Sequence, residues 1–320
     1  MQKRILQVGM LALGIVLLWL AFRGQDWEAL LAQLQEADYR WAVPVLLTTL
    51  LNHWVRARRW QLLIRTLGCP TRTSKTLAAI LVGYLVSYAV PRLGEVTRCG
   101  LLSDKNARQF PALFGTVIVE RSVDVLSLLL IGVLALLTAY ERLVGFVYQY
   151  LLAPVRGLAL GNSIKLAFAF TLYCIVLFLL LQWRFPDWAA WLRSYWQRFR
   201  SGLYALFRLR HRLLFLSYTL LLWLSYFGMT YLWFFAFRES QDLPVSAGMT
   251  MLFIGGIARS LPIQGGGMGA YHFLFAEGVA LFGIGLTTGS ALAVVIHGFQ
   301  SMFYLVGGAA AWGYLLYQKK

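Results

Sequence analysis

Acidic side chains, histidine and cysteine are all scarce in this sequence of 320 residues. It has 13 aspartates and glutamates, 4 histidines and 3 cysteines, and none of them follows the spacing of metal ligands. His-Glu-x-x-His, Gly-x-Ser-x-Gly and the Gly-rich nucleotide loop ending in Lys-Ser or Lys-Thr are also missing. We therefore expect no metal, no cofactor and no enzymatic activity, and any transport would run without an ATP motor in this chain.

Charged residues of either sign are few. They make up 13% of the chain, against roughly a quarter in soluble proteins, while 59% of residues are hydrophobic and the mean hydropathy is +0.65. Residues 1–320 therefore predict a single integral membrane domain. The formal net charge is +16, carried mainly by short loops beside apolar runs. This pattern indicates acidic lipid headgroups, and not nucleic acid, as the partner of the basic residues.

Ten apolar runs divide the chain. A bilayer crossing takes about 20 residues, and six runs predict crossings, the second with help from flanking residues: 5–22, 41–55, 123–140, 164–183, 213–237 and 288–317. The other four are shorter and suit half-spanning segments: 76–90, 107–119, 246–261 and 271–284. Lys3 and Arg4 precede the first run, but no small-residue cleavage site follows it, so we interpret it as an uncleaved first helix.

The charge of the loops predicts their orientation, because basic loops face the cytoplasm. The connections 56–75 and 184–212 are rich in arginine and are expected inside, whereas 23–40 and 238–243 are expected outside. This assignment holds when two hairpins enter the membrane from opposite faces and return.

The fold expected from these patterns is an all-α polytopic membrane protein. It has about six transmembrane helices plus two re-entrant helical hairpins, 76–119 and 246–284, in an inverted repeat. The first repeat covers about 41–140, the second about 213–317, and the basic loop 184–212 is cytoplasmic. Both termini are expected in the cytoplasm, and the protein in the cell inner membrane or plasma membrane.

Each expected hairpin is interrupted by Pro-x-x-Gly, which frees backbone groups that lipid cannot satisfy. In the first break, a helix starting at Pro91 would place Arg92, Glu95 and Arg98 on one face, with Gly94 completing the motif. Its free N–H groups and either arginine could bind a phosphate. The alternative is a cytoplasmic loop whose ion pairs only fix the hairpin.

A second group of charged residues opens the helix at 123–140. Glu120 and Asp124 share a helix face, and Arg121 can reach Asp124 at i, i+3. These side chains could contact the substrate or hold Arg92 or Arg98 in place. Equally, they could form an interfacial cluster that caps a crossing helix.

The second break carries few charged groups. Arg259 precedes Pro262, and Gln264, three successive glycines and His272 follow it. Gly265, Gly266 and Gly267 permit unusual backbone angles and close approach of a headgroup, although close helix packing alone would also explain them. His272, His297 and Gln300 are more often packing residues than proton carriers.

Four motifs resemble the lysylphosphatidylglycerol synthase transmembrane-region family, the flippase-like domain of multiple peptide resistance factor. They are Arg56-x-x-Arg59-Trp60, Pro91-Arg92-x-Gly94-Glu95-x-x-Arg98, Glu120-Arg121-x-x-Asp124 and Pro262-x-x-Gly265-Gly266-Gly267-Met268-Gly269. In members fused to a synthase, the resemblance implies movement of an aminoacylated lipid from the inner to the outer leaflet. Many relatives carry Arg-Glu after the glycines, where this chain has Tyr271-His272, and the aminoacyl-transferase domain is absent from this sequence.

Three functions remain open from the sequence. The first is a flippase-like transporter that moves a phospholipid or glycolipid with an anionic or zwitterionic headgroup through a polar cavity between the hairpins. The second is a non-transporting membrane partner of a lipid-synthesis enzyme, and a homo-oligomer is compatible with either function. The third is an intramembrane lipid transferase that uses Glu120, Asp124 or His272 as acid or base.

Overall fold

Most apolar runs of the sequence form helices close to their expected limits. The computed structural model describes residues 16, 18–20, 22, 23, 25–103, 109–146, 148, 186–261 and 263–318, which contain helices and no strand. The first helices are α2 (Trp27–Glu36), η1 (Tyr39–Trp41), α3 (Ala42–Arg65), α4 (Thr73–Ala89), α5 (Leu93–Leu102), α6 (Phe110–Thr138) and α7 (Tyr140–Phe146). They are followed by α10 (Pro186–Leu203), α11 (Arg212–Tyr231), η3 (Leu232–Ala236), α12 (Val245–Ser260), α13 (Gln264–Gly267), α14 (Ala270–Ala280) and α15 (Leu286–Tyr317).

Two helices extend beyond their apolar runs. Helix α3 continues to Arg65, so the connection expected at 56–75 begins only after that residue. Helix α6 joins the runs 107–119 and 123–140 into one helix of 29 residues. The prediction that 107–119 is the returning arm of a hairpin is therefore wrong. The charged residues between the two runs have ion-pair partners inside the protein, so the helix does not end there.

The arginine-rich segment 184–212, expected as a loop, contains helix α10. This helix packs on α6, where Gly115 and Gly202 allow a close approach. A Cβ atom added to Gly202 would lie 2.9 Å from the Cα atom of Gly115, and small residues are what such close crossings need. The rings of Phe114 and Phe199 also meet at this contact, with their centroids 6.4 Å apart.

Two of the described helical segments are long and apolar enough to cross a bilayer, Arg212–Ala236 and Leu286–Tyr317. The expected crossings at 5–22 and 164–183 lie wholly or mostly outside the described residues, as do the two chain ends. The expected crossings at 41–55 and 123–140 lie in α3 and α6, which also carry the charged residues of the site described below.

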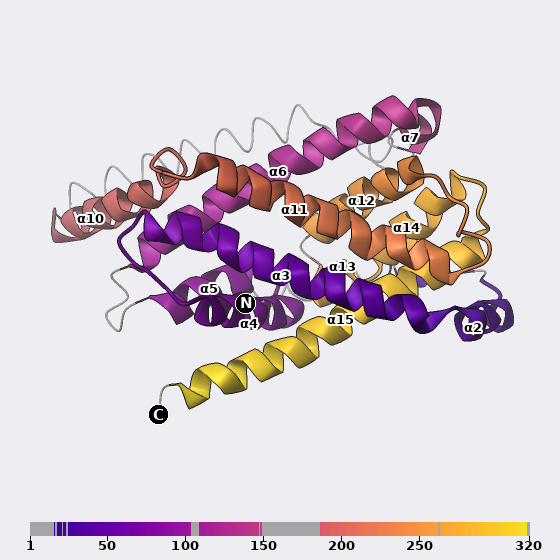
Figure 1. Ribbon diagram of the computed structural model, residues 1–320, viewed down its shortest axis with the longest axis horizontal. Coiled ribbons are helices and arrows are strands. Elements are labelled where there is room, and N and C mark those ends of the chain that lie inside the picture. The colour runs from indigo at the N-terminus through magenta and orange to yellow at the C-terminus, as the bar shows by residue number, and fades with distance from the viewer. Residues whose placement is uncertain are drawn as a thin grey trace.

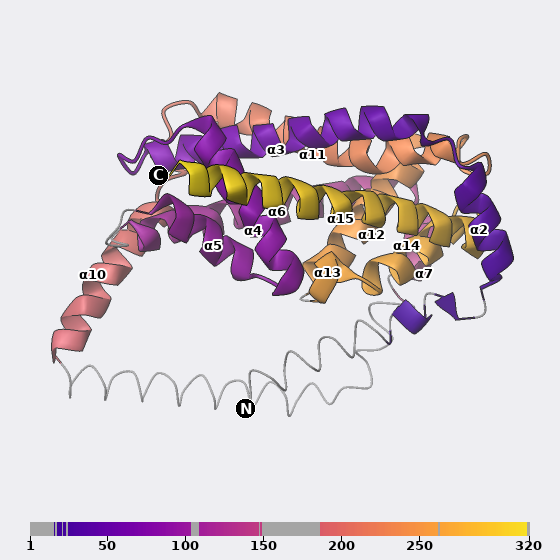
Figure 2. The ribbon, with the colours of Figure 1, turned by 90° about the horizontal axis from the view of Figure 1, so that it is seen from below.

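The broken segments meet near the middle of the molecule. Helices α4 and α5 pack against each other on either side of the first break, and α12 packs against α14 across the second. Figures 1 and 2 show the α4–α5 pair approaching the short helix α13 from one end of the long axis, and α12 and α14 from the other. Helix α13 contacts α4 directly. The two Pro-x-x-Gly segments of the sequence are therefore neighbours in space.

Separate hydrophobic cores lie on either side of this meeting point. One is built largely from η3, α12, α14 and α15, and includes Trp233, Phe234 and Phe275. The other joins α3, α4, α5 and α6 through Trp60 and Ile80 and neighbouring apolar side chains. The polar region of the protein lies between these two cores.

The connections expected to share a side of the membrane lie together. Gln33 of α2 donates a hydrogen bond to Glu239 at 3.0 Å, joining the segments 23–40 and 238–243 at one end of the molecule. At the other end, Tyr314 near the end of α15 donates to Ser74 at the start of α4, at 3.0 Å. These contacts agree with the expected grouping of the connections, and the membrane face of each group stays a prediction.

Candidate functional site

A cavity of about 450 Å³ lies where the two breaks meet, with walls from the helices of both halves. Its charged lining consists of four arginines and two carboxylates: Arg56, Arg92, Arg121 and Arg259 with Glu95 and Asp124. The formal excess is two positive charges. An aromatic wall completes it: Tyr84, Tyr88, Trp223, Tyr226 and Tyr304. A volume between about 300 and 1,000 Å³ is typical of ligand pockets.

The first break differs in detail from its expected geometry. Helix α5 begins at Leu93, because Arg92 adopts a left-handed conformation with φ 70°. The first amides of α5 are already used: Leu93 donates to the carbonyl of Val90, and Gly94 to the hydroxyl of Ser87 at 3.1 Å. The prediction that the N-terminus of this helix offers free N–H groups to a phosphate is therefore wrong for these two amides.

The side chain of Arg92 connects the two breaks. Its Nη2 atom donates a hydrogen bond of 2.7 Å to the backbone carbonyl of Ser260, the last residue of α12. A left-handed backbone is costly for any residue with a Cβ and persists where the surroundings impose it. Here the hydrogen bond to α12 and the tight turn between α4 and α5 both hold Arg92 in this conformation.

The prediction that Arg92, Glu95 and Arg98 share one helix face fails at Arg92, which precedes the helix. Glu95 and Arg98 lie three residues apart in α5, and both side chains pair with α6. Glu95 accepts a 2.6 Å hydrogen bond from Arg121 Nε, and Arg98 Nη2 lies 2.9 Å from Glu120 Oε2. The latter two atoms are at ion-pair distance without the alignment of a hydrogen bond.

Helix α3 completes this network. Arg59 lies 2.7 Å from Asp124 and 3.6 Å from Glu120, and Arg56 lies 3.4 Å from Asp124. Arg121 also reaches Asp124 at 3.7 Å, in the predicted i, i+3 relation. We call the seven residues of this network the ion-pair cluster: Arg56, Arg59, Glu95, Arg98, Glu120, Arg121 and Asp124.

The ion-pair cluster has a buried end and an end open to the cavity. Arg59 and Glu120 are fully buried and Arg98 is nearly so, and none of the three lines the cavity. Removing one partner of a buried ion pair leaves an uncompensated charge, at a cost of about 3–5 kcal/mol. The buried end therefore joins α3, α5 and α6, while Glu95, Arg121 and Asp124 present the other end to the cavity.

The second break depends on glycine conformations. Gly265, Gly266 and Gly267 have φ values of 66°, 68° and 89°, a region that side chains with a Cβ rarely adopt. The prediction of unusual backbone angles at these glycines is confirmed. The carbonyl oxygen of Gly265 lies 2.9 Å from His297 Nε2 on α15, which fixes the loop against that helix.

Arg259 is the basic residue of the second break. Its guanidinium carbon lies 4.4 Å from the centroid of the Tyr271 ring, and the side chain lines the cavity. Its Nε and Nη2 atoms are buried and have no hydrogen-bond partner among the described residues. Arg259 also makes no ion pair with a described acid. This arginine therefore brings an uncompensated positive charge to the cavity.

The structure brings together about half of the predicted site residues. Those that line the cavity are Arg92, Glu95, Arg121, Asp124, Arg259 and Gly266. Those that lie outside its lining are Gly94, Arg98, Glu120, Gln264, Gly265, Gly267 and His272. Gly94 faces Gly83 across the α4–α5 contact, so its position reflects helix packing.

Several lining residues were not among the predicted site residues. Arg56 was expected in the cytoplasmic connection 56–75, whereas it lies within α3, so its role in the cavity lining was missed. Its Nη2 atom donates a 2.6 Å hydrogen bond to the Tyr226 hydroxyl. Tyr84 and Tyr304 stack with centroids 4.8 Å apart, and nothing in the sequence separates them from ordinary packing aromatics. The described residues hold no group of three or more His, Cys, Asp or Glu side chains that could bind a metal.

Comparison with protein families matches residues 7–308 to the family described as the lysylphosphatidylglycerol synthase TM region. Neither the curated proteins nor the solved structures return a match. The matched segment contains both breaks, the ion-pair cluster and the cavity lining. The chain therefore belongs to the lysylphosphatidylglycerol synthase TM-region family of membrane proteins.

Proposed function

We propose that this protein is a flippase-like transporter that moves an anionic lipid headgroup between the two leaflets. The observation that carries the proposal is the arginine-rich cavity at the meeting point of the two breaks. The headgroup would cross in this cavity while the acyl chains stay in the bilayer. In this proposal α4–α5 and α12–α14 are the re-entrant hairpins of the inverted repeat.

The order of the helices supports the inverted repeat. A long helix, a broken pair and a second long helix follow one another in α3–α6, and the same order recurs in α11–α15. The two pairs approach from opposite ends of the molecule (Figure 2). Broken helices that meet from opposite sides are the usual way in which transporters build a central substrate site.

The charge of the cavity favours an anionic headgroup over a cationic aminoacylated one. The carboxylates of Glu95 and Asp124 already pair with arginines, so a cationic group would find no free acid on the described lining. Arg259 brings to the cavity lining a guanidinium group with no described acid beside it, and Arg92 lies at the opposite break with one donor occupied. A phosphodiester between them would neutralise one of the two excess positive charges of the lining.

The same pairing supports a role without catalysis. A general acid or base must reach the proton that it transfers. Glu120 is fully buried beside Arg98 and Arg59, and His272 lies outside the cavity lining. Asp124 faces three arginines, which stabilise its carboxylate as a structural charge.

The proposal is tested by measuring flux of fluorescent phosphatidylglycerol in proteoliposomes with a leaflet-specific quencher. Arg259→Gln and Arg92→Gln should each slow the flux about tenfold to a hundredfold, the loss of one charge-assisted hydrogen bond. The matched control is Arg40→Gln, which removes a charge from an exposed side chain at a distance from the cavity. Flux of phosphatidylglycerol no faster than in empty vesicles would contradict the proposal.

A further inference from the structure

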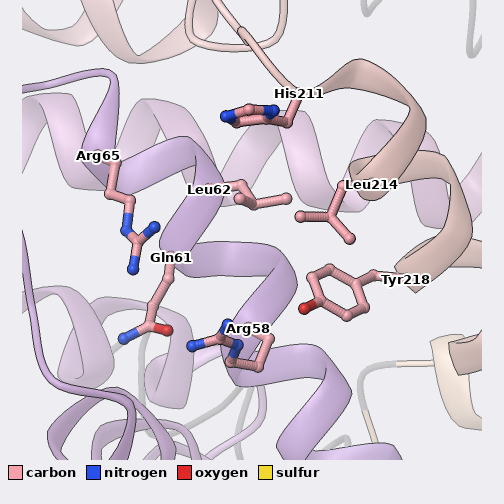
Figure 3. A pocket seen from close by; sticks show the side chains of 7 residues that line it. All are labelled: Arg58, Gln61, Leu62, Arg65, His211, Leu214 and Tyr218. Atoms are coloured by element: carbon pink, nitrogen blue, oxygen red, sulfur yellow. The ribbon is translucent and has the colours of Figure 1, made fainter.

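A second, smaller cavity lies between α3 and α11, lined by none of the residues of the central one. Its volume is about 170 Å³, and the residues that line it are Arg58, Gln61, Leu62, Arg65, His211, Leu214 and Tyr218. The α3 members recur at the i, i+3, i+4 and i+7 positions of one helix face. Figure 3 shows the polar ends of Arg58, Arg65, His211 and Tyr218 arranged around Leu62 and Leu214.

This pocket offers hydrogen-bond donors and no negative charge. Among the described residues, Arg58 and Arg65 make no ion pair, and no acid lines the pocket. Arg58 makes a long contact of 3.4 Å with the Thr73 hydroxyl, and its guanidinium carbon lies 5.7 Å from the centroid of the Trp54 ring. The amide of Gln61 is occupied, since it donates to Thr71 and accepts from Thr73. Two guanidinium groups, an imidazole and a phenol therefore line this pocket, and no described acid lies among them.

The beginning of α11 adds to the positive field. Helix α11 starts at Arg212 immediately after His211, and no side chain caps its first turn. The first N–H groups of a helix lack partners within the helix and favour anions. His211, which precedes this turn, and Leu214 within it both line the pocket.

We propose that the pocket between α3 and α11 binds a phosphate group. Two arginine forks match the oxyanion geometry of phosphate, and Tyr218 can donate a further hydrogen bond. The apolar surroundings fit the acyl chains of an anionic phospholipid whose headgroup occupies the pocket, since Leu213, Leu214 and Trp54 are 80%, 40% and 43% exposed. Free inorganic phosphate has the same chemistry and is the alternative source.

The test is native mass spectrometry of the full-length protein in detergent, titrated with phosphatidylglycerol, phosphatidylcholine or inorganic phosphate. Wild-type protein should retain phosphatidylglycerol at this pocket, and Arg65→Gln should weaken that binding about tenfold, one charge-assisted hydrogen bond. Arg65→Lys, which keeps the charge and loses the planar fork, should bind with intermediate affinity. Arg72→Gln is the matched control, because Arg72 belongs to the same basic connection and does not line the pocket.

The outcomes separate this site from the central cavity and the two sources from each other. Arg259→Gln should leave the Arg65-dependent binding intact, even if the transport proposal fails. Competition by inorganic phosphate at equal affinity identifies the free anion as the ligand, and retention of phosphatidylglycerol alone identifies the headgroup. Equal lipid and phosphate binding by wild-type protein, Arg65→Gln and Arg58→Gln/Arg65→Gln would overturn the proposal.

Discussion

At the buried end of the ion-pair cluster, we expect removal of the Glu120 charge to destabilise the protein more than removal of the Arg98 charge. Glu120→Gln keeps the shape of the side chain and removes its charge, which leaves Arg98 buried above the Trp60 ring with no acid beside it. Arg59 keeps Asp124 at 2.7 Å, so the loss falls mainly on Arg98. We expect a loss of about 3–5 kcal/mol in the free energy of unfolding.

The reverse change should cost less. In Arg98→Met the Glu120 carboxylate still has Arg59 at 3.6 Å, so we expect a loss of about 1–3 kcal/mol. The cluster of four arginines and three acids carries one excess positive charge, which Glu120→Gln raises to two and the double variant restores to one. The double variant should therefore be more stable than the sum of the single losses predicts, with a coupling of about 0.5–3 kcal/mol.

The assay is equilibrium unfolding of the four proteins in mixed detergent micelles, followed by intrinsic fluorescence. Equal losses for the two single variants, or strictly additive losses in the double variant, would refute the reasoning. Arg121→Gln is a useful comparison, because Arg121 is 37% exposed at the cavity end and water can compensate for its loss. It should lower stability less than Glu120→Gln.

Two glycine-related predictions follow from backbone geometry. Gly94→Ala would push a Cβ atom into the carbonyl oxygen of Gly83 and should lower the free energy of unfolding by about 1–3 kcal/mol. Gly100→Ala on the same helix meets nothing within 4 Å and should be neutral or stabilising by up to about 1 kcal/mol. Thermal unfolding of both variants in one detergent checks this, and equal midpoints would refute it. Arg92→Gly should be about 1–2 kcal/mol more stable than Arg92→Ala, because only glycine adopts φ 70° without strain, while both variants lose the bond to Ser260 and the lipid flux. A less stable glycine variant would contradict the strain argument.

The parts of the fold that were predicted from sequence rest on local signals. Apolar length fixed the limits of α4, α12 and α15 to within a few residues, because a helix end needs polar groups or a breaker. Proline and glycine located both breaks, since they disrupt helices in any context. The continuity of α6 was missed because its charged residues were interpreted without their partners on α3 and α5.

The errors in the site have the same origin. The i, i+3 rule for Arg92, Glu95 and Arg98 applies only when all three are helical, and the left-handed Arg92 excludes that. Apart from the i, i+3 pair of Arg121 and Asp124, the ion-pair partners in the cluster lie on different helices, so spacing along one segment cannot identify them. Tyr84, Tyr226 and Tyr304 were missed because tyrosine accounts for 16 residues of the chain and only tertiary packing selects those that line the cavity.

The single hydrogen bond from Arg92 to the Ser260 carbonyl has a consequence for lipid movement under the proposed function. A phosphate that binds the Arg92 guanidinium takes it from the Ser260 carbonyl and so releases the end of α12. Binding of the ligand and separation of the two halves are then the same step, in which Arg92 exchanges one hydrogen-bond acceptor for another. The exchange replaces a neutral acceptor by a charged one, a difference of only about 1–2 kcal/mol. Such a small difference makes the link reversible, which lets the headgroup leave as readily as it enters.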